Sequence, residues 1–284
     1  MNWENLKDDL EAKVDLHIHS SFSDSDLTIE DIFKIARLKG LSAIAITDHD
    51  TVDGMDEAKR YSAIYGIELI EGIELSTQKD DTEIHMLGYF LDSSNLKLKE
   101  ELANIRKLRK DRLCGMIEKL NQLGFNLDEG AILSRIKGAM PTRLHLALEL
   151  VRKGRVKTLR EAFAKYLSPG KPGYLSRFKY SVKEGIELIK NYGGLAFLAH
   201  PQLIPEKSWI EEFIALGIDG LEIAYPRLST AKTLLYKEMA DKFGILKSGG
   251  SDAHGSYKEF IQIGEVFVPY AWVVEMKKRI NISK

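Results

Sequence analysis

The sequence comprises 284 residues with a formal net charge of −1, and its 44% hydrophobic and 29% charged residues are typical of a globular protein. No apolar run approaches the roughly 20 residues of a membrane span, which argues against a membrane partner. The one cysteine excludes an intrachain disulfide, and the polar N-terminus does not resemble a signal peptide, so we expect a cytoplasmic protein.

The first 90 residues alternate short apolar runs with amphipathic stretches. Residues 28–40 carry apolar side chains at helical spacing, with Thr28 as a plausible N-cap and Gly40 as a stop signal. Residues 41–50 are almost continuously apolar, which is typical of a strand buried on both faces of a parallel sheet. In chain order the pattern predicts a strand over 14–20, a helix over 28–40, a strand over 41–50, a helix over 54–66, and strands over 67–77 and 82–92.

Residues 97–171 differ from the rest in both pattern and charge. They show only helical signals, over 99–124, 127–138, 141–154 and 158–167, and end in the turn-forming run 168–173. They contain 18 Lys and Arg against 8 Asp and Glu, a net charge of +10, which leaves −11 for the remainder. This segment is either a set of solvated helices or a cap that attracts an anionic substrate.

The β/α alternation then resumes to the end of the chain. Helices are predicted near 181–193, 208–217, 229–244 and 271–280, and strands over 194–201, 217–225, 245–254 and 265–270. Seven or eight strand–helix units predict an α/β fold, a distorted TIM-like barrel with a helical insertion after strand four. We assign residues 1–96 and 172–284 to the barrel and residues 97–171 to a basic, helical insertion domain.

Histidines and acidic residues gather at the ends of the predicted strands. A single histidine in an apolar strand is more often a core residue than a metal ligand. Here, however, six of the seven histidines lie at or near the ends of predicted parallel strands, which share one face of a barrel. Together with nearby carboxylates they give nine candidate ligands: His17, His19, Asp24, His49, Glu74, His85, His200, Asp252 and His254.

The composition of this set predicts its metals. Imidazole and carboxylate without thiolate suits Mn²⁺, Fe²⁺ or Zn²⁺. Nine ligands exceed the needs of one ion, so we expect two or three ions that share a bridging carboxylate, an arrangement suited to cleaving phosphate esters. Asp15 and Asp48 precede ligand histidines and either orient them or cap the local backbone.

These motifs together resemble the polymerase and histidinol phosphatase (PHP) family of phosphoesterases. The resemblance extends over residues 14–254 and rests on Asp15-Leu-His17-Ile-His19-Ser20, Ser23-Asp24, Thr47-Asp48-His49, Gly72-Ile-Glu74, His85-Met-Leu-Gly, Ala199-His200-Pro201 and Ser251-Asp252-Ala-His254. It implies a distorted seven-stranded β/α barrel that holds two or three ions.

The resemblance also implies how the ligands are shared. His17, His19, Glu74 and Asp252 would hold one ion. Glu74 would bridge to a second ion held by His85 and His200, and Asp24, His49 and His254 would hold the third. A hydroxide on the metals would be the nucleophile, and no side chain is assigned as general acid.

The insertion resembles one branch of the family, which acts on nucleoside 3′,5′-bisphosphates and on short RNA from the 5′ end. The relevant motifs are Pro141-Thr-Arg143-Leu-His145, Ala162-Phe-x-x-Tyr166-Leu and Gly170-Lys171-Pro172-Gly-Tyr174. Arg143 is the strongest candidate for a phosphate clamp, since a guanidinium matches phosphate geometry. Lys171 and Arg227 are weaker candidates for substrate binding, and His145 is expected either to pack against the Arg143 loop or to orient it.

We therefore expect a metal-dependent phosphoesterase that hydrolyses a terminal phosphate monoester of a nucleotide, with a 3′,5′-bisphosphate as the leading substrate and trimming of short RNA as a second activity. A histidinol-phosphate phosphatase and a non-catalytic PHP interaction module are the alternatives. A small phosphorylated substrate is the expected partner. Neither long duplex nucleic acid nor an obligate protein partner is indicated.

Overall fold

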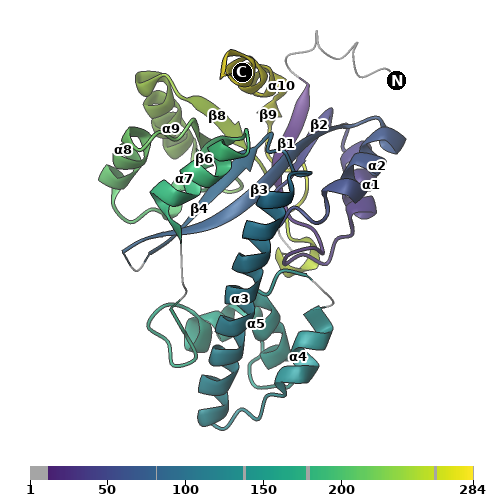
Figure 1. The fold of residues 1–284 in the computed structure, drawn as a ribbon, viewed down its shortest axis with the longest axis vertical. Coiled ribbons are helices and arrows are strands. Elements are labelled where there is room, and N and C mark those ends of the chain that lie inside the picture. Colours follow the sequence, from purple (N-terminus) through teal and green to yellow (C-terminus); the bar gives the residue numbers. More distant parts are fainter. Residues whose placement is uncertain (1–11, 81, 137–138, 177–179, 259–260, 284) are drawn as a thin grey trace.

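A computed structural model describes residues 12–80, 82–136, 139–176, 180–258 and 261–283 (Figure 1). The N-terminal segment interpreted above, residues 1–11, lies outside this part. The strands form a curved sheet that is surrounded by helices, and a second group of helices lies below it. Within the described residues, no helix is both long and apolar enough to span a bilayer.

The strands form one sheet in the order β8-β7-β6-β4-β3-β2-β1-β9, with β5 beside β3. Their bounds are β1 Lys13–Ile18, β2 Ala43–Ile46, β3 Glu68–Lys79, β4 Thr82–Tyr89, β5 Tyr180–Ser181, β6 Leu195–Leu198, β7 Gly220–Ala224, β8 Leu246–Gly249 and β9 Val268–Pro269. The segment after β8 returns to β1, where Asp252 N donates to His17 O at 2.7 Å and His19 N to Ala253 O at 3.1 Å. The sheet is therefore a nearly closed barrel, which confirms the predicted α/β, distorted TIM-like fold.

Two strands, β4 and the short β9, run against the predicted parallel arrangement, and β9 is antiparallel to β1. β4 is antiparallel to both β3 and β6, so the expectation that strand four is parallel to its neighbours is wrong. Lys79 pairs with Thr82, and a connection this short can join only antiparallel strands, because a parallel crossover needs a dozen or more residues. The reversal places the N-terminal half of β4, with His85, beside the C-terminal half of β3.

A register shift in β1 changes which side chains face the barrel interior. Asp15 pairs with Ile44 and Ile18 with Ile46, so Leu16 and His17 together stand opposite Ala45 alone. Bulges of this kind re-aim side chains next to functional sites. Leu16 belongs to the interior apolar cluster with Leu87, Tyr89 and Phe197, while His17 lies in the polar layer above it.

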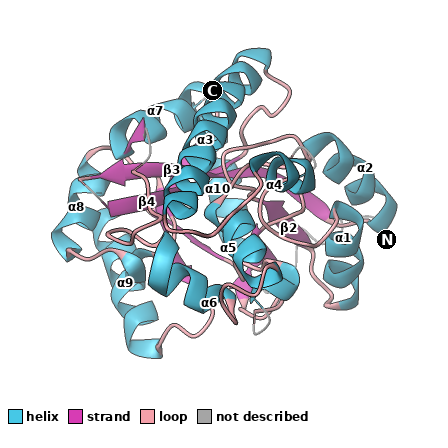
Figure 2. Cartoon of the chain, turned by 90° about the horizontal axis from the view of Figure 1, so that it is seen from below, coloured by secondary structure: helices cyan, strands magenta, loops and turns pink. Residues whose placement is uncertain are grey.

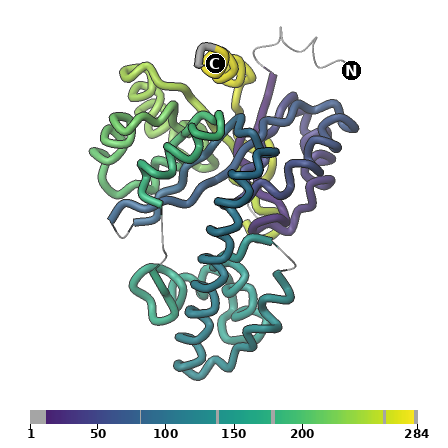
Figure 3. The backbone as a smooth tube through the Cα atoms, viewed as in Figure 1, coloured from purple at the N-terminus to yellow at the C-terminus, as the bar shows by residue number. Residues whose placement is uncertain are grey.

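Helices cover the outside of the barrel, and α10 closes its floor. The outer helices are α1 Ile29–Leu38, α2 Met55–Tyr65, α7 Val182–Asn191, α8 Lys207–Ala215 and α9 Thr230–Phe243, and the floor helix is α10 Tyr270–Ser283. The predicted start of α1 is confirmed, because the Thr28 side chain accepts a hydrogen bond from Asp31 N. Val273 and Met276 of α10 pack into the interior cluster, at the end remote from the lower helices (Figure 3).

The chain between β4 and β5 forms the lower group of helices, which we call the cap. It contains α3 Leu96–Gln122, α4 Glu129–Ile136, α5 Arg143–Arg152 and α6 Leu159–Ala162, followed by a π-helical turn over Phe163–Leu167. The first half of α3 packs on the barrel through Leu98, Leu102 and Ile105. Its second half joins α4–α6 in a separate apolar cluster. Seen from below, the cap helices lie across the end of the barrel (Figure 2).

Candidate metal centre

All nine predicted ligands lie together in a polar layer at the end of the barrel that faces the cap. Three overlapping groups each bring their ligand atoms within 4.8 Å of one another. The groups are His17, His19, Glu74 and Asp252; His49, Glu74 and His85; and His19, Asp24, His49 and His254. These groups differ from the expected sets in three details. His19 also joins the Asp24 group, and His49 joins Glu74 and His85. His200 belongs to none of the three groups, although its Nε2 lies 2.9 Å from Glu74 Oε1. We call the nine residues the ligand cluster.

Glu74 lies at the centre of the ligand cluster. One of its oxygens, Oε1, is 2.9 Å from both His85 Nδ1 and His200 Nε2. The other, Oε2, is 3.0 Å from His19 Nε2 and 3.3 Å from both His17 Nε2 and His49 Nδ1. A carboxylate whose two oxygens face different imidazoles has the geometry needed to bridge two ions.

Strand ends in the cluster carry unusual backbone conformations. His200 has φ 31° and Asp252 has φ 53°, in the left-handed region that residues other than glycine rarely adopt. Such conformations cost free energy and collect at functional sites. At His200 the backbone N–H donates to Glu222 Oε2 at 2.6 Å, which holds the turn in place.

The charges in the cluster are buried and balanced by one another. Burial opposes ionisation of Glu74, yet His49, His17 and His85 hold the pKa of its carboxyl well below the usual range. Burial also opposes protonation of His19, but its hydrogen bonds to Asp252 and Glu74 raise its pKa to about 9. The positive charge that these carboxylates require is the charge that divalent cations would supply.

Three buried polar atoms in the cluster have no hydrogen-bond partner among the described residues: His19 Nδ1, Asp24 Oδ1 and His49 Nδ1. Buried polar atoms are normally paired, and those that are not call for an explanation such as an ion. The set contains imidazole nitrogens and carboxylate oxygens without thiolates, which suits the ions expected from the sequence. The residues present therefore fit a divalent metal cluster.

Glu222 of β7 belongs to the candidate site and was not predicted from the sequence. Its Oε1 lies 2.8 Å from His17 Nδ1, and its side chain is fully buried. A carboxylate on the far nitrogen of a metal-binding histidine fixes the tautomer and the ring orientation. An acidic residue inside the apolar run Gly220–Ala224 was the available signal, because a carboxylate is rarely buried without a partner.

Among the described residues, Asp15 and Asp48 contact backbone N–H groups, including that of His17, and serine hydroxyls rather than imidazole rings. Asp15 accepts hydrogen bonds from the backbone N–H groups of Ser251 and Gly264, at 2.8 and 2.7 Å. Asp48 accepts from the backbone N–H and hydroxyl of Ser20 and from the Ser23 hydroxyl. Of the two interpretations left open, the structure favours backbone capping, which fixes the segments that carry the ligands.

Arg143 reaches the ligand cluster from the cap. Its side chain lines a small cavity together with Asp24, His49 and His85. One guanidinium nitrogen donates to Glu83 Oε2 at 2.8 Å, and Glu83 Oε1 is 3.4 Å from His85 Nε2. His145 Nδ1 accepts from Thr142 N at 3.1 Å and so caps the helix that begins at Arg143.

The other two residues that were predicted to bind the substrate lie further from the cluster. Lys171 is exposed in the turn after the π-helical segment, and no contact joins its side chain to the cluster within the described residues. Arg227 is exposed after β7 and lines a cavity between cap and barrel. Lys258 lines the same cavity and was not predicted, although its Nζ lies 2.7 Å from Asp252 Oδ2.

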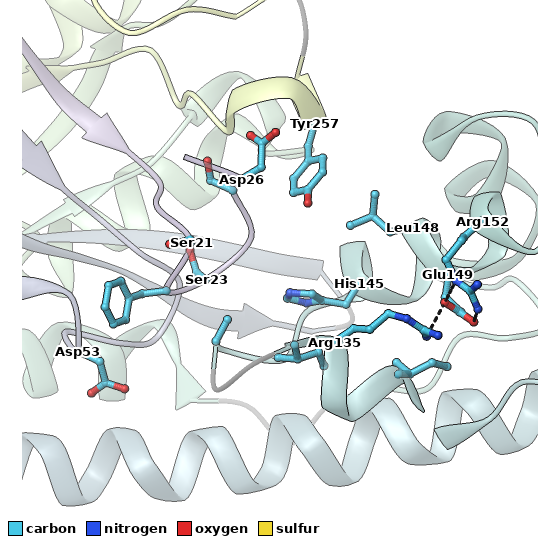
Figure 4. A pocket seen from close by; sticks show the side chains of 15 residues that line it. Ser21, Ser23, Asp26, Asp53, Arg135, His145, Leu148, Glu149, Arg152 and Tyr257 are labelled. Carbon is cyan, nitrogen blue, oxygen red and sulfur yellow. Dashed lines mark hydrogen bonds and ion pairs between the residues drawn. The ribbon is translucent and has the colours of Figure 1, made fainter. Parts of the chain in front are cut away.

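A larger cavity of about 740 Å³ also separates cap and barrel (Figure 4). Ser21, Ser23 and Asp26 line it from the barrel side, and His145 and Leu148 from the cap. Its lining includes Ser23 and Ser25, the neighbours of Asp24. The space next to the ligand cluster is therefore large enough for a small organic molecule.

The chain is similar over most of its length to two bacterial enzymes. It is 34% identical over 256 residues to the 3′,5′-nucleoside bisphosphate phosphatase of Chromobacterium violaceum, which covers 86% of this chain and 87% of that protein. It is 33% identical over 248 residues to the 5′-3′ exoribonuclease of Haemophilus influenzae, which covers 85% of this chain and 90% of that protein. A solved structure from Bifidobacterium adolescentis, described as a metal-dependent phosphoesterase, has a TM-score of 0.86 and 31% identity, over 94% of this chain and 96% of that one.

A barrel that gathers imidazoles and carboxylates at one end is the arrangement expected of a metal-dependent hydrolase, and the relatives identify the bond that is cleaved as a phosphate ester. The PHP domain family matches residues 15–130. With its relatives, this match shows that the chain belongs to the PHP family and is a hydrolase of phosphate esters that uses divalent metal ions. The alternative of a non-catalytic interaction module is therefore not supported.

Proposed function

We propose that this enzyme removes the 3′-phosphate of nucleoside 3′,5′-bisphosphates and also trims short RNA from its 5′ end. The relatives named for these two activities support the proposal. The observation that carries it is the position of Arg143, a cap residue beside His49 and His85 at the ligand cluster. A substrate with a second phosphate can engage both the cluster and this guanidinium.

The ligand cluster would hold two or three ions, in the sets named from the sequence. Mn²⁺, Fe²⁺ and Zn²⁺ all suit its donors. Bound ions would supply a nucleophilic water and neutralise the oxygens of the scissile phosphate. Glu222, 2.8 Å from His17 Nδ1, would fix the tautomer and the orientation of the His17 ring.

Arg143 would bind the second phosphate. Glu83 and the Leu167 carbonyl accept from two of its N–H groups, at 2.8 and 3.5 Å. A guanidinium has five such groups, so donors remain for a phosphate. The guanidinium also lies 5.9 Å from the Phe163 ring and 6.0 Å from the Tyr174 ring, which limits its freedom. Lys171 and Arg227 stay weaker candidates for contacts to the substrate.

The cavity of about 740 Å³ would take the nucleoside. It carries the Phe22 and Tyr257 rings, and Ile132 and Leu148 add apolar surface from the cap. Aromatic and apolar side chains of this kind suit the faces of a nucleobase. The small cavity at Arg143, His49 and His85, about 90 Å³, has room only for a group the size of phosphate.

The test compares wild type with Arg143→Ala on adenosine 3′,5′-bisphosphate and on p-nitrophenyl phosphate. We expect kcat/KM for the bisphosphate to fall roughly 10- to 100-fold, the value of charge-assisted hydrogen bonds of about 1.5–3 kcal/mol. The aryl phosphate lacks a second phosphate and should lose far less. Arg155→Ala is the matched control, because Arg155 contacts the Phe125 carbonyl inside the cap.

Equal losses on both substrates would contradict the clamp at Arg143. Histidinol phosphate belongs in the same panel. Faster turnover of histidinol phosphate than of the bisphosphate would replace the proposed substrate by that alternative.

A further inference from the structure

A second cavity between cap and barrel, of about 550 Å³, is lined by cations from both sides. Lys157 and Arg160 come from the start of α6 in the cap, and Arg227 and Lys258 come from the loops after β7 and β8 in the barrel. Among the described residues that line it, none is acidic. We call the cavity that these four residues line the basic cavity. Four cations around one space favour a ligand with more than one negative charge.

The basic cavity adjoins the ligand cluster through Asp252. Lys258 Nζ lies 2.7 Å from Asp252 Oδ2, and Asp252 Oδ1 lies 3.3 Å from His19 Nε2. The Tyr225 hydroxyl, two residues before Arg227, also donates to Asp252 Oδ2 at 2.7 Å. A phosphate in the cluster would therefore have the basic cavity as its neighbour on the Asp252 side.

Arg143 reaches the cluster from a different side. Its partner Glu83 contacts His85, which lies across Glu74 from Asp252. The cluster thus has a cation on its His85 side and a group of cations on its Asp252 side. A bisphosphate with its 3′-phosphate in the cluster needs one of these sites, for its 5′-phosphate, and leaves the other without a partner.

The chemistry of the two proposed substrates explains why the site has one more cationic region than the bisphosphate needs. In both, water adds to phosphorus, the bond from phosphorus to O3′ breaks and a proton ends on O3′. The bisphosphate gives a 5′-nucleotide and inorganic phosphate. RNA gives a 5′-nucleotide and a shorter RNA that keeps the phosphate at its new 5′ end. Only in RNA does the scissile phosphate carry a further chain, through its O5′ atom.

We infer that the basic cavity binds the phosphodiester backbone of the nucleotides 3′ of the scissile bond in short single-stranded RNA. The inference rests on the proposed function and assigns the part of the site that distinguishes RNA from the bisphosphate. Arg143 holds the 5′-phosphate, the ligand cluster takes the scissile phosphate, and Lys157, Arg160 and Arg227 hold the following phosphates. Lys258 is the residue of the basic cavity that contacts the cluster.

The test reverses the charge of two exposed cap residues in the double variant Lys157→Glu/Arg160→Glu. The matched control is Lys107→Glu/Lys110→Glu, two exposed lysines on α3 that do not line the basic cavity. The substrates are a 5′-phosphorylated tetraribonucleotide and adenosine 3′,5′-bisphosphate. In the Lys157→Glu/Arg160→Glu variant we expect kcat/KM for the RNA to fall at least tenfold more than kcat/KM for the bisphosphate. In the control variant the ratio of the two kcat/KM values should stay at the wild-type value.

A binding measurement separates this inference from the proposed function. Fluorescence anisotropy of the labelled tetraribonucleotide with EDTA-treated protein reports RNA binding without turnover. The plot of log affinity against log salt concentration should become less steep by about 1.4 in the double variant, at roughly 0.7 per lost phosphate contact on a single strand. Arg227→Gln, on the barrel side, should weaken the same binding.

Each outcome has a separate meaning. Unchanged RNA affinity in the double variant, or equal losses of turnover on both substrates, would overturn the RNA site. Wild-type protein that releases no phosphate from the bisphosphate would contradict the proposed function instead. In that case the anisotropy result still decides whether the basic cavity binds RNA.

Discussion

Individual residues of the ligand cluster depend on partners that are distant in sequence. His17 lies 205 positions from Glu222, yet their side chains are 2.8 Å apart. The bulge in β1 turns His17 toward the interior, and β7 places the carboxylate behind it. The orientation of this ligand is therefore set by two strands, and its residue type alone does not specify it.

Glu222→Gln tests this dependence. The amide keeps the size of the side chain but lacks the charge that fixes the His17 tautomer, so metal affinity should fall about 10- to 100-fold. Activity should return when excess Mn²⁺ is added. The measurement is a titration of EDTA-treated protein with metal, followed by phosphate release.

Glu212→Gln is the control, because Glu212 is exposed on α8 and pairs only with Lys79 among the described residues. An unchanged metal affinity in Glu222→Gln would remove the orienting role of Glu222.

The residue types of the candidate site could be predicted from the sequence, and its geometry only in part. Histidines and carboxylates at strand ends stand out because apolar strands rarely carry them. Glu222 carried the same signal, a carboxylate inside an apolar strand, and was missed because it lies in mid-strand with no motif around it. Lys258 was missed for another reason, because a surface-type lysine gives no sign of its distance from Asp252 in the fold.

Among the elements, α3 connects barrel and cap. Arg109 of α3 is buried and donates from Nε to Asp50 Oδ2 at 2.6 Å, from one terminal nitrogen to Ser76 Oγ at 2.9 Å, and from the other to the Pro141 carbonyl at 3.2 Å. Pro141 leads directly into the helix that begins at Arg143. One guanidinium thus joins the loop after β2, strand β3 and the start of α5.

Arg109→Met should destabilise the protein by about 3–5 kcal/mol, because it leaves the Asp50 carboxylate buried without its guanidinium partner. Arg106→Met is a matched change one helical turn away, at a partly exposed pair with Asp53. It should cost less than about 1 kcal/mol. Urea unfolding of both variants measures the difference, and equal costs would contradict a structural role for the buried pair.

The elements of the fold could be predicted better than their directions. The helix over residues 28–40 was predicted from the spacing of its apolar residues, and α1 buries Ile29, Ile32, Phe33 and Ala36. The direction of β4 was wrong because an apolar run looks the same in a parallel and an antiparallel strand. The four residues between the predicted third and fourth strands were the missing signal, since they are too few for a parallel crossover.

In the molecule as a whole, the net positive and negative charges are divided between the cap and the barrel. Residues 97–171 carry a net charge of +10 and the remainder −11. The acidic part contains the carboxylates of the ligand cluster, and the basic part provides Arg143, Lys157 and Arg160 on the cap side. Cations bound in the cluster and the basic cap would together attract a phosphorylated substrate to the junction between them.

The central claim is that the ligand cluster holds divalent ions that hydrolyse a nucleotide phosphate ester. Phosphate release from adenosine 3′,5′-bisphosphate tests it most directly, measured on one preparation as purified, after EDTA, and after Mn²⁺ is returned. His17→Ala, which removes a ligand, is measured alongside and is expected to remain folded by circular dichroism.

The account predicts release by the purified protein, loss with EDTA, recovery with Mn²⁺, and none from His17→Ala under any of these conditions. Release that continues at the same rate in EDTA, or wild-type turnover by folded His17→Ala, would contradict it.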